Sequence, residues 1–205
     1  MILAIDTSSA ACSAALLAPD GAVVAAADEQ FGRGHAERLA GMIAELAGVH
    51  VPTSICVGIG PGSFTGIRVG IATAHGLSIG WSVGLMGMDS LALAAAGIEP
   101  DGEPITVAII GGHGELFVRS FDGHSLLPID AVASLTPQAA AERATGHRVV
   151  GSGAEALVAA RGYGEAIEAF PCAADALRLP LALRSFDPKP AYARAPDAKP
   201  ASAAA

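Results

Sequence analysis

A glycine-rich segment in the first half of the chain constrains the fold most strongly. Residues 60–70 follow the short β-branched run Ser54–Ile59, and this order predicts a buried strand, a tight turn and then a helix over about 64–79. Small residues recur every four positions along that helix: Gly66, Gly70, Ala74 and Ser78. One helix face therefore carries almost no side chain and lets another backbone approach closely. The sequence leaves open whether that neighbour belongs to this chain or to a partner.

The same segment does not fit the common glycine motifs. Its third glycine falls one position late for the dinucleotide fingerprint G-x-G-x-x-G, and Pro61 takes the place of the first glycine in a G-x-S-x-G nucleophile elbow. A glycine turn before a helix N-terminus could still bind an anion.

Composition excludes several classes of protein. The 205 residues allow one large domain or two small ones, and 52% hydrophobic residues exclude disorder of the main body. The net charge of −8 argues against a free-standing nucleic-acid binder. Lys189 and Lys199 are the two lysines of the chain, so residues 1–188 cannot hold a Walker-type phosphate loop.

Cysteine usage and hydropathy predict a cytoplasmic protein. The three cysteines lie far apart with no C-x-x-C pair, which is typical of free thiols in a reducing compartment. The N-terminus does not resemble a signal peptide. The uncharged stretch Val69–Met88 contains five glycines, so we interpret it as a buried helix and strand and expect no membrane segment.

Strands alternate with helices along the chain, which predicts an α/β fold. The expected strands are 1–6, 11–17, 22–30, 54–59, 83–86, 105–110, 115–121 and 148–150. The expected helices are 34–47, 64–79, a short one from Asp89 or Ser90 to Gly97, 136–146, 154–160 and 173–184. A linker-like stretch at 98–104 divides an N-terminal lobe (1–100) from a smaller C-terminal α/β lobe (101–186), and a loosely held Pro/Ala-rich tail (187–205) follows.

Candidate sites are few. Asp6, Thr7, Ser8 and Ser9 connect two predicted strands and could cradle a phosphate, although an Asx turn that satisfies its own backbone explains them more simply. His35 lacks a second histidine four residues later, where Leu39 stands, so an H-x-x-x-H metal site is absent. The residues therefore predict neither a catalytic set nor a metal site.

Three segments together resemble the TsaB (YeaZ) family of the bacterial machinery that makes N6-threonylcarbamoyladenosine in tRNA. They are Ile5–Ser9, Gly34–Leu39 and Gly60–Gly70, of which the third is the specific one. The resemblance covers residues 1–90 and is thin after 100. There Ala191-Tyr192-Ala193-Arg194 resembles the family's Pro-x-Tyr-Leu-Arg tail with alanine at 193.

The resemblance implies an actin-like, sugar-kinase and Hsp70 (ASKHA) fold of two mixed-sheet lobes with flanking helices. It also implies a non-catalytic, dimerising subunit that pairs with a TsaD-like catalytic subunit and is joined by a TsaE-like ATPase. The resemblance further implies that ATP and metal are bound by the partner subunits and none by this chain alone, and that Asp6–Ser9 is a vestige of a phosphate loop. tRNA is reached only through the complex, and the isolated chain could form a homodimer.

The family pairs through the first two long helices, which here are about 34–47 and 64–79. The implied interface residues are His35, Leu39, Met42, Ile43, Leu46, Phe64, Ile67, Gly70, Ile71 and Ala74. We expect a leucine at position 70 to break pairing while leaving the fold intact.

One departure and two alternatives accompany this hypothesis. The family's Asp-Ala-Arg-like turn is replaced by Gly111–Gly114, after which Glu115 and Phe117 still fit the pattern. The alternatives are an ATP-dependent small-molecule kinase of the same superfamily and a glycoprotease-like peptidase. The kinase needs an acid that Gly111–Gly114 does not supply, and the peptidase needs a nucleophile–base pair or a metal.

Overall fold

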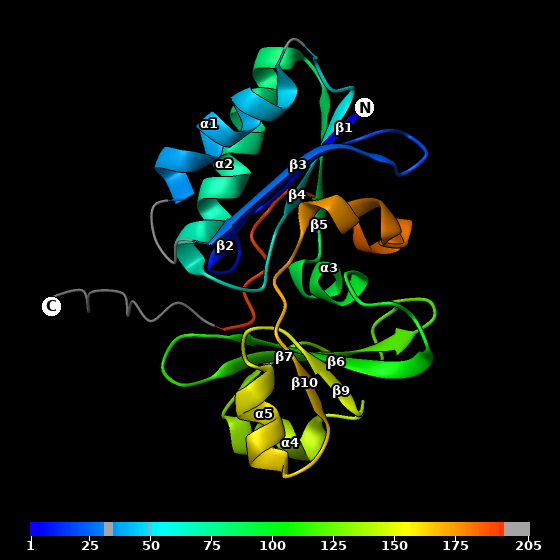
Figure 1. The fold of residues 1–205 in the computed structure, drawn as a ribbon. Coiled ribbons are helices and arrows are strands. Elements are labelled where there is room, and N and C mark those ends of the chain that lie inside the picture. Colours follow the sequence, from blue (N-terminus) through cyan, green and yellow to red (C-terminus); the bar gives the residue numbers. More distant parts are fainter. Residues whose placement is uncertain (31–34, 49, 195–205) are drawn as a thin grey trace, which may run out of the picture.

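Apolar runs closed by turn residues build the first of two sheets. The computed structural model describes residues 1–30, 35–48 and 50–194, which form two lobes (Figure 1). The first sheet contains β1 (Ile2–Asp6), β2 (Ala11–Leu17), β3 (Val23–Gln30), β4 (Ser54–Gly58) and β5 (Gly84–Met88). Its order is β3-β2-β1-β4-β5, in which β2 pairs antiparallel with β3 and β1, and β4 pairs parallel with β1 and β5. These five strands confirm the predicted ones to within two residues at each end.

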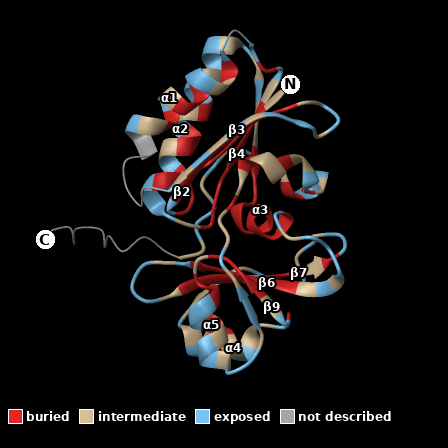
Figure 2. Ribbon diagram, in the orientation of Figure 1, coloured by how far each residue is buried: buried red, intermediate tan, exposed pale blue. Residues whose placement is uncertain are grey.

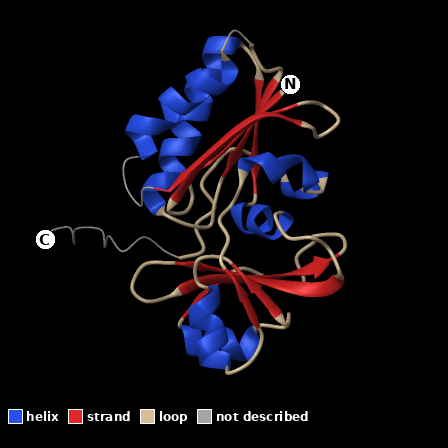
Figure 3. Ribbon diagram, in the orientation of Figure 1, coloured by secondary structure: helices blue, strands red, loops and turns tan. Residues whose placement is uncertain are grey.

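Two long helices cover one face of this sheet, as Figure 3 shows. Helix α1 (His35–Ala47) ends before Gly48, whose φ of +53° suits glycine. Helix α2 (Phe64–Trp81) is capped by Ser63, whose hydroxyl accepts a hydrogen bond from the Gly66 amide at 3.2 Å. Apolar side chains of both helices pack with β1, β2 and β4 into one core cluster.

The second lobe repeats the topology of the first. Its strands are β6 (Gly102–Ile110), β7 (Leu116–Gly123), β8 (Ala133–Leu135), β9 (Arg148–Val150) and β10 (Glu165–Ile167). The order β10-β9-β6-β7-β8 has the same antiparallel and parallel neighbours as the first sheet. Helices α4 (Pro137–Arg143) and α5 (Ala154–Arg161) take the places of α1 and α2. The sequence contains no internal repeat strong enough to predict that the two lobes share one topology.

A short helix joins the lobes. Helix α3 (Ser90–Ala96) is buried along its whole length and lies between the two sheets (Figure 2). The Asp89 carboxylate caps it by accepting hydrogen bonds from the Leu91 and Ala92 amides. Its leucines and alanines share one apolar cluster with strands of both lobes, so the lobes are fastened along this side.

Some predicted elements differ from the structure. The three-residue strands β8 and β10 were not predicted, and β6 begins at Gly102, inside the expected linker. The predicted helix 173–184 is wrong, because the structure has two 3-10 helices, Ala173–Arg178 (η1) and Leu181–Leu183 (η2). Pro180 lies between them, and proline disfavours a helical conformation in the residue before it.

The chain returns to the first lobe after β10. The Ala173 amide donates to the Ser13 hydroxyl of β2 at 2.6 Å, and Gly87 of β5 exchanges two backbone hydrogen bonds with Phe186. The expectation of a loosely held tail from 187 is therefore corrected as far as Arg194. There the Ala191 amide donates to the Ile59 carbonyl at 2.8 Å. Residues 195–205 of that tail lie outside the described residues.

Candidate functional site

The turn Asp6–Ser9 between β1 and β2 is buried. One carboxylate oxygen of Asp6 accepts hydrogen bonds from the Ser8 amide at 2.8 Å and the Ser8 hydroxyl at 2.7 Å. The other accepts from the Ser90 hydroxyl at 2.6 Å. This geometry confirms the Asx turn, while phosphate binding stays a prediction. Burial raises the pKa of Asp6, although the hydrogen bonds from Ser90 and Ser8 act to lower it.

The glycine segment before and within α2 packs directly on this turn. The Ser63 amide donates to the Ser8 carbonyl at 2.6 Å, and the Thr7 hydroxyl donates to the Gly66 carbonyl at 2.7 Å. A Cβ atom at Gly66 would collide with the Thr7 carbonyl, and one at Gly70 would lie 2.5 Å from Thr7 Oγ1. The bare helix face therefore lets α2 approach the β1–β2 turn of its own chain.

Most of the predicted interface side chains lie inside the first lobe. Seven of the ten predicted residues are buried: Leu39, Met42, Ile43, Ile67, Gly70, Ile71 and Ala74. Leu46 is partly buried and Phe64 is 41% exposed. His35 is the first residue of α1, and its side chain is not among the parts that the structure describes. The seven buried residues pack in the interior of the lobe, and of them only Ile43 also lines the groove between the outward sides of the two helices. That corrects the expectation for Gly70, where a leucine would disturb the fold itself.

The outward face of α2 carries a second row of small residues that the sequence interpretation missed. Ala72, Gly76 and Gly80 are exposed and spaced four apart, and a Cβ atom at either glycine would have nothing within 4 Å. Ala40 and Ala44 of α1 are also exposed. The spacing of the row was visible in the sequence, but the side of the helix it occupies was not.

A groove of about 340 Å³ runs between the outward sides of α1 and α2. It is lined by Ala40, Ile43, Ala44, Ala47, Gly48, His50, Val51, Thr73, Leu77 and Trp81. The lining is mostly apolar, with Val51 56% exposed. Together with the exposed α2 residues Ala72, Gly76, Ile79 (79% exposed) and Gly80, these groove residues form what we call the outer helical face.

A larger cavity of about 880 Å³ lies between the lobes. From the first lobe it is lined by Ser8, Ser9, Ala10, Gly62, Ser63, Phe64 and Thr65. From the second it is lined by Ile109, Ile110, Gly111, Gly112, His113, Phe117, Ser152, Glu168 and Phe170, and from the C-terminal segment by Tyr192, Ala193 and Arg194. Ser8 and Ser9 of the predicted phosphate turn therefore face the same cleft as the turn Gly111–Gly114, whose sequence differs from the family pattern.

The turn at Gly111–Gly114 contributes backbone and one histidine to the cleft. Its neighbour Glu115 accepts a hydrogen bond from the Ser134 hydroxyl at 2.6 Å and pairs with Arg194 at 3.5 Å. The Ser134 hydrogen bond, reinforced by Arg194, lowers the pKa of Glu115. Phe117 is buried. The Glu115 carboxylate is thus engaged within the chain.

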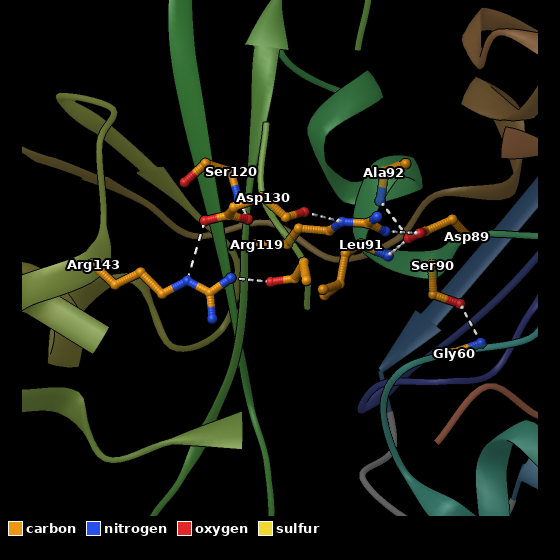
Figure 4. A network of polar contacts seen from close by, with 10 residues as sticks. Gly60, Asp89, Ser90, Leu91, Ala92, Arg119, Ser120, Asp130 and Arg143 are labelled. Atoms are coloured by element: carbon orange, nitrogen blue, oxygen red, sulfur yellow. Dashed lines mark hydrogen bonds and ion pairs between the residues drawn. The ribbon is translucent and has the colours of Figure 1, made fainter. Parts of the chain in front are cut away.

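An ionic network crosses between the lobes beside α3, and sequence reasoning found only its first member. The Asp89 carboxylate receives the Arg119 guanidinium of β7 at 2.7 Å, and Arg119 also donates to the Asp130 carbonyl at 3.1 Å (Figure 4). Asp130 in turn pairs with Arg143 at 3.3 Å. Burial raises the pKa of Asp89 against the opposing effect of its amide hydrogen bonds and Arg119. A lone arginine within the apolar run of β7 was the available signal for Arg119.

Two buried thiols and the placement of metal-ligating residue types bear on nucleophilic and metal chemistry in the described part of the chain. Burial raises the pKa of the Cys12 and Cys56 thiols to about 11, which keeps them protonated at neutral pH. Residues 1–30, 35–48 and 50–194 contain no group of three His, Cys, Asp or Glu side chains placed to hold a metal ion. That this chain binds no cofactor or metal stays a prediction.

Comparison with known proteins shows the family. The model described as "TsaD: tRNA N6-adenosine threonylcarbamoyltransferase" matches residues 24–135, more than half of the chain. The tRNA threonylcarbamoyladenosine biosynthesis protein TsaB of Escherichia coli is 40% identical over 101 residues, which cover 47% of this chain and 43% of that protein. The chain belongs to the TsaD-type domain family and, within it, to TsaB/YeaZ. The alignments span less than half the length of these curated TsaB relatives, and the Haemophilus influenzae TsaB is matched over a similar share.

Solved structures extend the TsaB/YeaZ likeness through both lobes. YeaZ from Pseudomonas aeruginosa superposes with a TM-score of 0.72 at 27% identity, covering 87% of this chain and 89% of that chain. The ethanolamine utilization protein EutJ of Carboxydothermus hydrogenoformans, at 15% identity, covers 84% of this chain and 86% of its own with a TM-score of 0.52 and shares the fold alone. The predicted actin-like fold class is confirmed.

The uncharged stretch Val69–Met88 forms most of α2 and all of β5. Among the described residues, no helix has both the length and the hydropathy needed to cross a bilayer. The five glycines and the packing of α2 on the first sheet account for the stretch.

Proposed function

We propose that this chain is the non-catalytic partner of a TsaD-like catalytic subunit in the formation of N6-threonylcarbamoyladenosine in tRNA. The family membership supports a role in this biosynthesis. The observation that carries the pairing is the outer helical face, where exposed small residues border an apolar groove. Faces of this kind let a second pair of helices pack at short interaxial distance.

The interior of the first lobe supports the non-catalytic part of the proposal. Asp6 and Thr7, which would have to serve a phosphate or its metal, are committed to hydrogen bonds with Ser8, Ser90 and Gly66. The Gly111–Gly114 turn on the opposite side of the cleft carries no carboxylate. In this proposal ATP and metal are bound by the partner subunits, including a TsaE-like ATPase.

The charge of the chain fits the same division of labour. A net charge of −8 cannot attract the phosphates of tRNA, so the substrate is held by the complex. In this proposal the modification of tRNA takes place in the cytoplasm. Without the catalytic subunit, the outer helical face would pair with a second copy of itself.

A co-purification experiment with the TsaD-like subunit of the same organism tests the proposal. Gly76→Leu fills open space on the outer helical face, so we expect the lobe to fold and pairing to weaken about 100-fold, because overpacking in an interface is costly. Ala160→Leu is the matched control, since it places the same side chain on exposed helix α5 of the other lobe.

Retained pairing in both variants would overturn the interface, and turnover of ATP by the purified chain alone would overturn the non-catalytic role. Thermal unfolding of each variant verifies that loss of pairing is not loss of fold.

A further inference from the structure

The C-terminal segment of the described chain spans the mouth of the interlobe cleft. We call residues 191–194 the strap, and its residues Tyr192, Ala193 and Arg194 line the 880 Å³ cavity together with residues of both lobes. On the opposite side the lobes share the apolar cluster around α3 and the Asp89–Arg119 ion pair. The lobes are thus joined at one side by a shared apolar core, and at the other side the strap contacts both of them.

The first end of the strap is bound to the first lobe. The Ala191 amide donates to the Ile59 carbonyl at 2.8 Å. The Tyr192 ring lies 4.8 Å from the Phe64 ring at the start of α2, and the Arg68 guanidinium stacks 3.5 Å above Phe64. Aromatic pairs and cation–π contacts of this geometry are attractive even when partly exposed.

The second end of the strap is bound to the second lobe. Arg194 donates to the Gly112 carbonyl at 3.2 Å and pairs with Glu115 at 3.5 Å. The Ser134 hydroxyl donates a hydrogen bond to the same Glu115 carboxylate at 2.6 Å. This contact orients the carboxylate that Arg194 pairs with. Four consecutive residues therefore connect α2 of one lobe with the β6–β7 turn of the other.

We propose that the strap sets the opening of the interlobe cleft, holding the lobes together when Tyr192 and Arg194 are both engaged and letting the cleft open when either end is released. Tyr192 is 39% exposed and the Arg194 side chain 29% exposed. Contacts at that exposure each change a two-state ratio by about two- to tenfold, which suits a reversible switch better than a permanent lock. This inference does not depend on the proposed function.

Distance measurement between two spin labels on the full chain tests the strap. His75→Cys on α2 and Ala160→Cys on α5 are exposed positions in different lobes, and a Cys172→Ser background leaves only the buried Cys12 and Cys56 thiols. Tyr192→Ala and Arg194→Ala each release one end. We expect the interlobe distance distribution to shift to longer values in both, with at least a fivefold faster exchange of the Ala191 amide.

Arg178→Ala is the matched control, because it removes an arginine that pairs with Glu99 and Asp175 away from the cleft, and it should change neither reading. Arg194→Gln replaces Arg194→Ala if the latter lowers thermal stability. Unchanged distances in both strap variants overturn the proposal. Faster Ala191 exchange with unchanged distances also overturns it, because the strap would then peel away without moving the lobes.

Discussion

The two faces of helix α2 carry the same kind of sequence and meet opposite environments. On the inner face, Gly66 and Gly70 let the helix rest on the β1–β2 turn, where Thr7 occupies the space of a side chain. On the outer face, Gly76 and Gly80 have the same four-residue spacing and open space around them. A row of small residues indicates that another backbone packs closely against that face of the helix. Whether this backbone belongs to the same chain or to a partner depends on which way the face points in the fold.

The largest expected effect is a difference in stability between leucine substitutions on the inner and outer faces of α2. Gly66→Leu should lower the free energy of unfolding by about 3 kcal/mol or more, since its side chain would meet the Thr7 carbonyl, a backbone atom of a buried turn. Urea unfolding followed by circular dichroism measures the change. Gly76→Leu serves as control and should be at least as stable as the wild type, because leucine forms helix better than glycine and meets open space there; an equal loss in both variants would mean that the outer face is not open.

A second effect concerns the carboxyl group beneath the inner face. Burial raises the pKa of Asp6 above its ordinary value of 3.8, so the folded state keeps this proton to higher pH than the unfolded state does. The stability contributed by the protonated group is therefore lost as pH rises above that value. We expect the unfolding free energy of the wild type to fall relative to that of Asp6→Asn as the pH is raised from below about 4 toward neutrality. A pH-independent difference would show that Asp6 has an ordinary pKa.

The smallest effect has the opposite sign on the two faces. Gly76→Ala should raise the free energy of unfolding by about 0.5–1 kcal/mol, because alanine is the better helix former and its methyl group meets nothing. Gly70→Ala should lower it, because the methyl group would displace the Thr7 hydroxyl from its bond to the Gly66 carbonyl. Differential scanning calorimetry compares the two, and a stabilising Gly70→Ala would contradict the inner packing.

The sequence predicted those elements whose pattern is local. β1, β2, β4 and α2 show clear apolar periods, and the Asp89 cap marks the start of α3. The strands β8 and β10 are three residues long and form because β7 and β9 offer partners, which no local pattern records. The strap escaped prediction for the same reason, since its contacts join residues about 80 or more positions apart in the chain.

The candidate site was predicted in part. The turn Asp6–Ser9 and the two long helices were recognised, yet the apolar stripe Leu39, Met42 and Ile43 was assigned to a partner when it fills the core beneath α1. Periodicity finds the apolar side of a helix, and in a two-layer lobe that side faces the chain's own sheet. The outward surface is then made of what remains, here alanine, glycine and a few half-exposed aliphatic side chains.

Hydroxyl-radical footprinting of the chain with and without its TsaD-like partner tests the division between the faces most directly, because it reports on side chains. We predict that labelling of Leu77, Ile79 and Trp81 falls at least threefold in the complex, while Ile67 and Ile71 stay weakly labelled in both states. Unchanged labelling of the outer three residues in a verified complex would contradict the assignment of the outer helical face as the pairing surface.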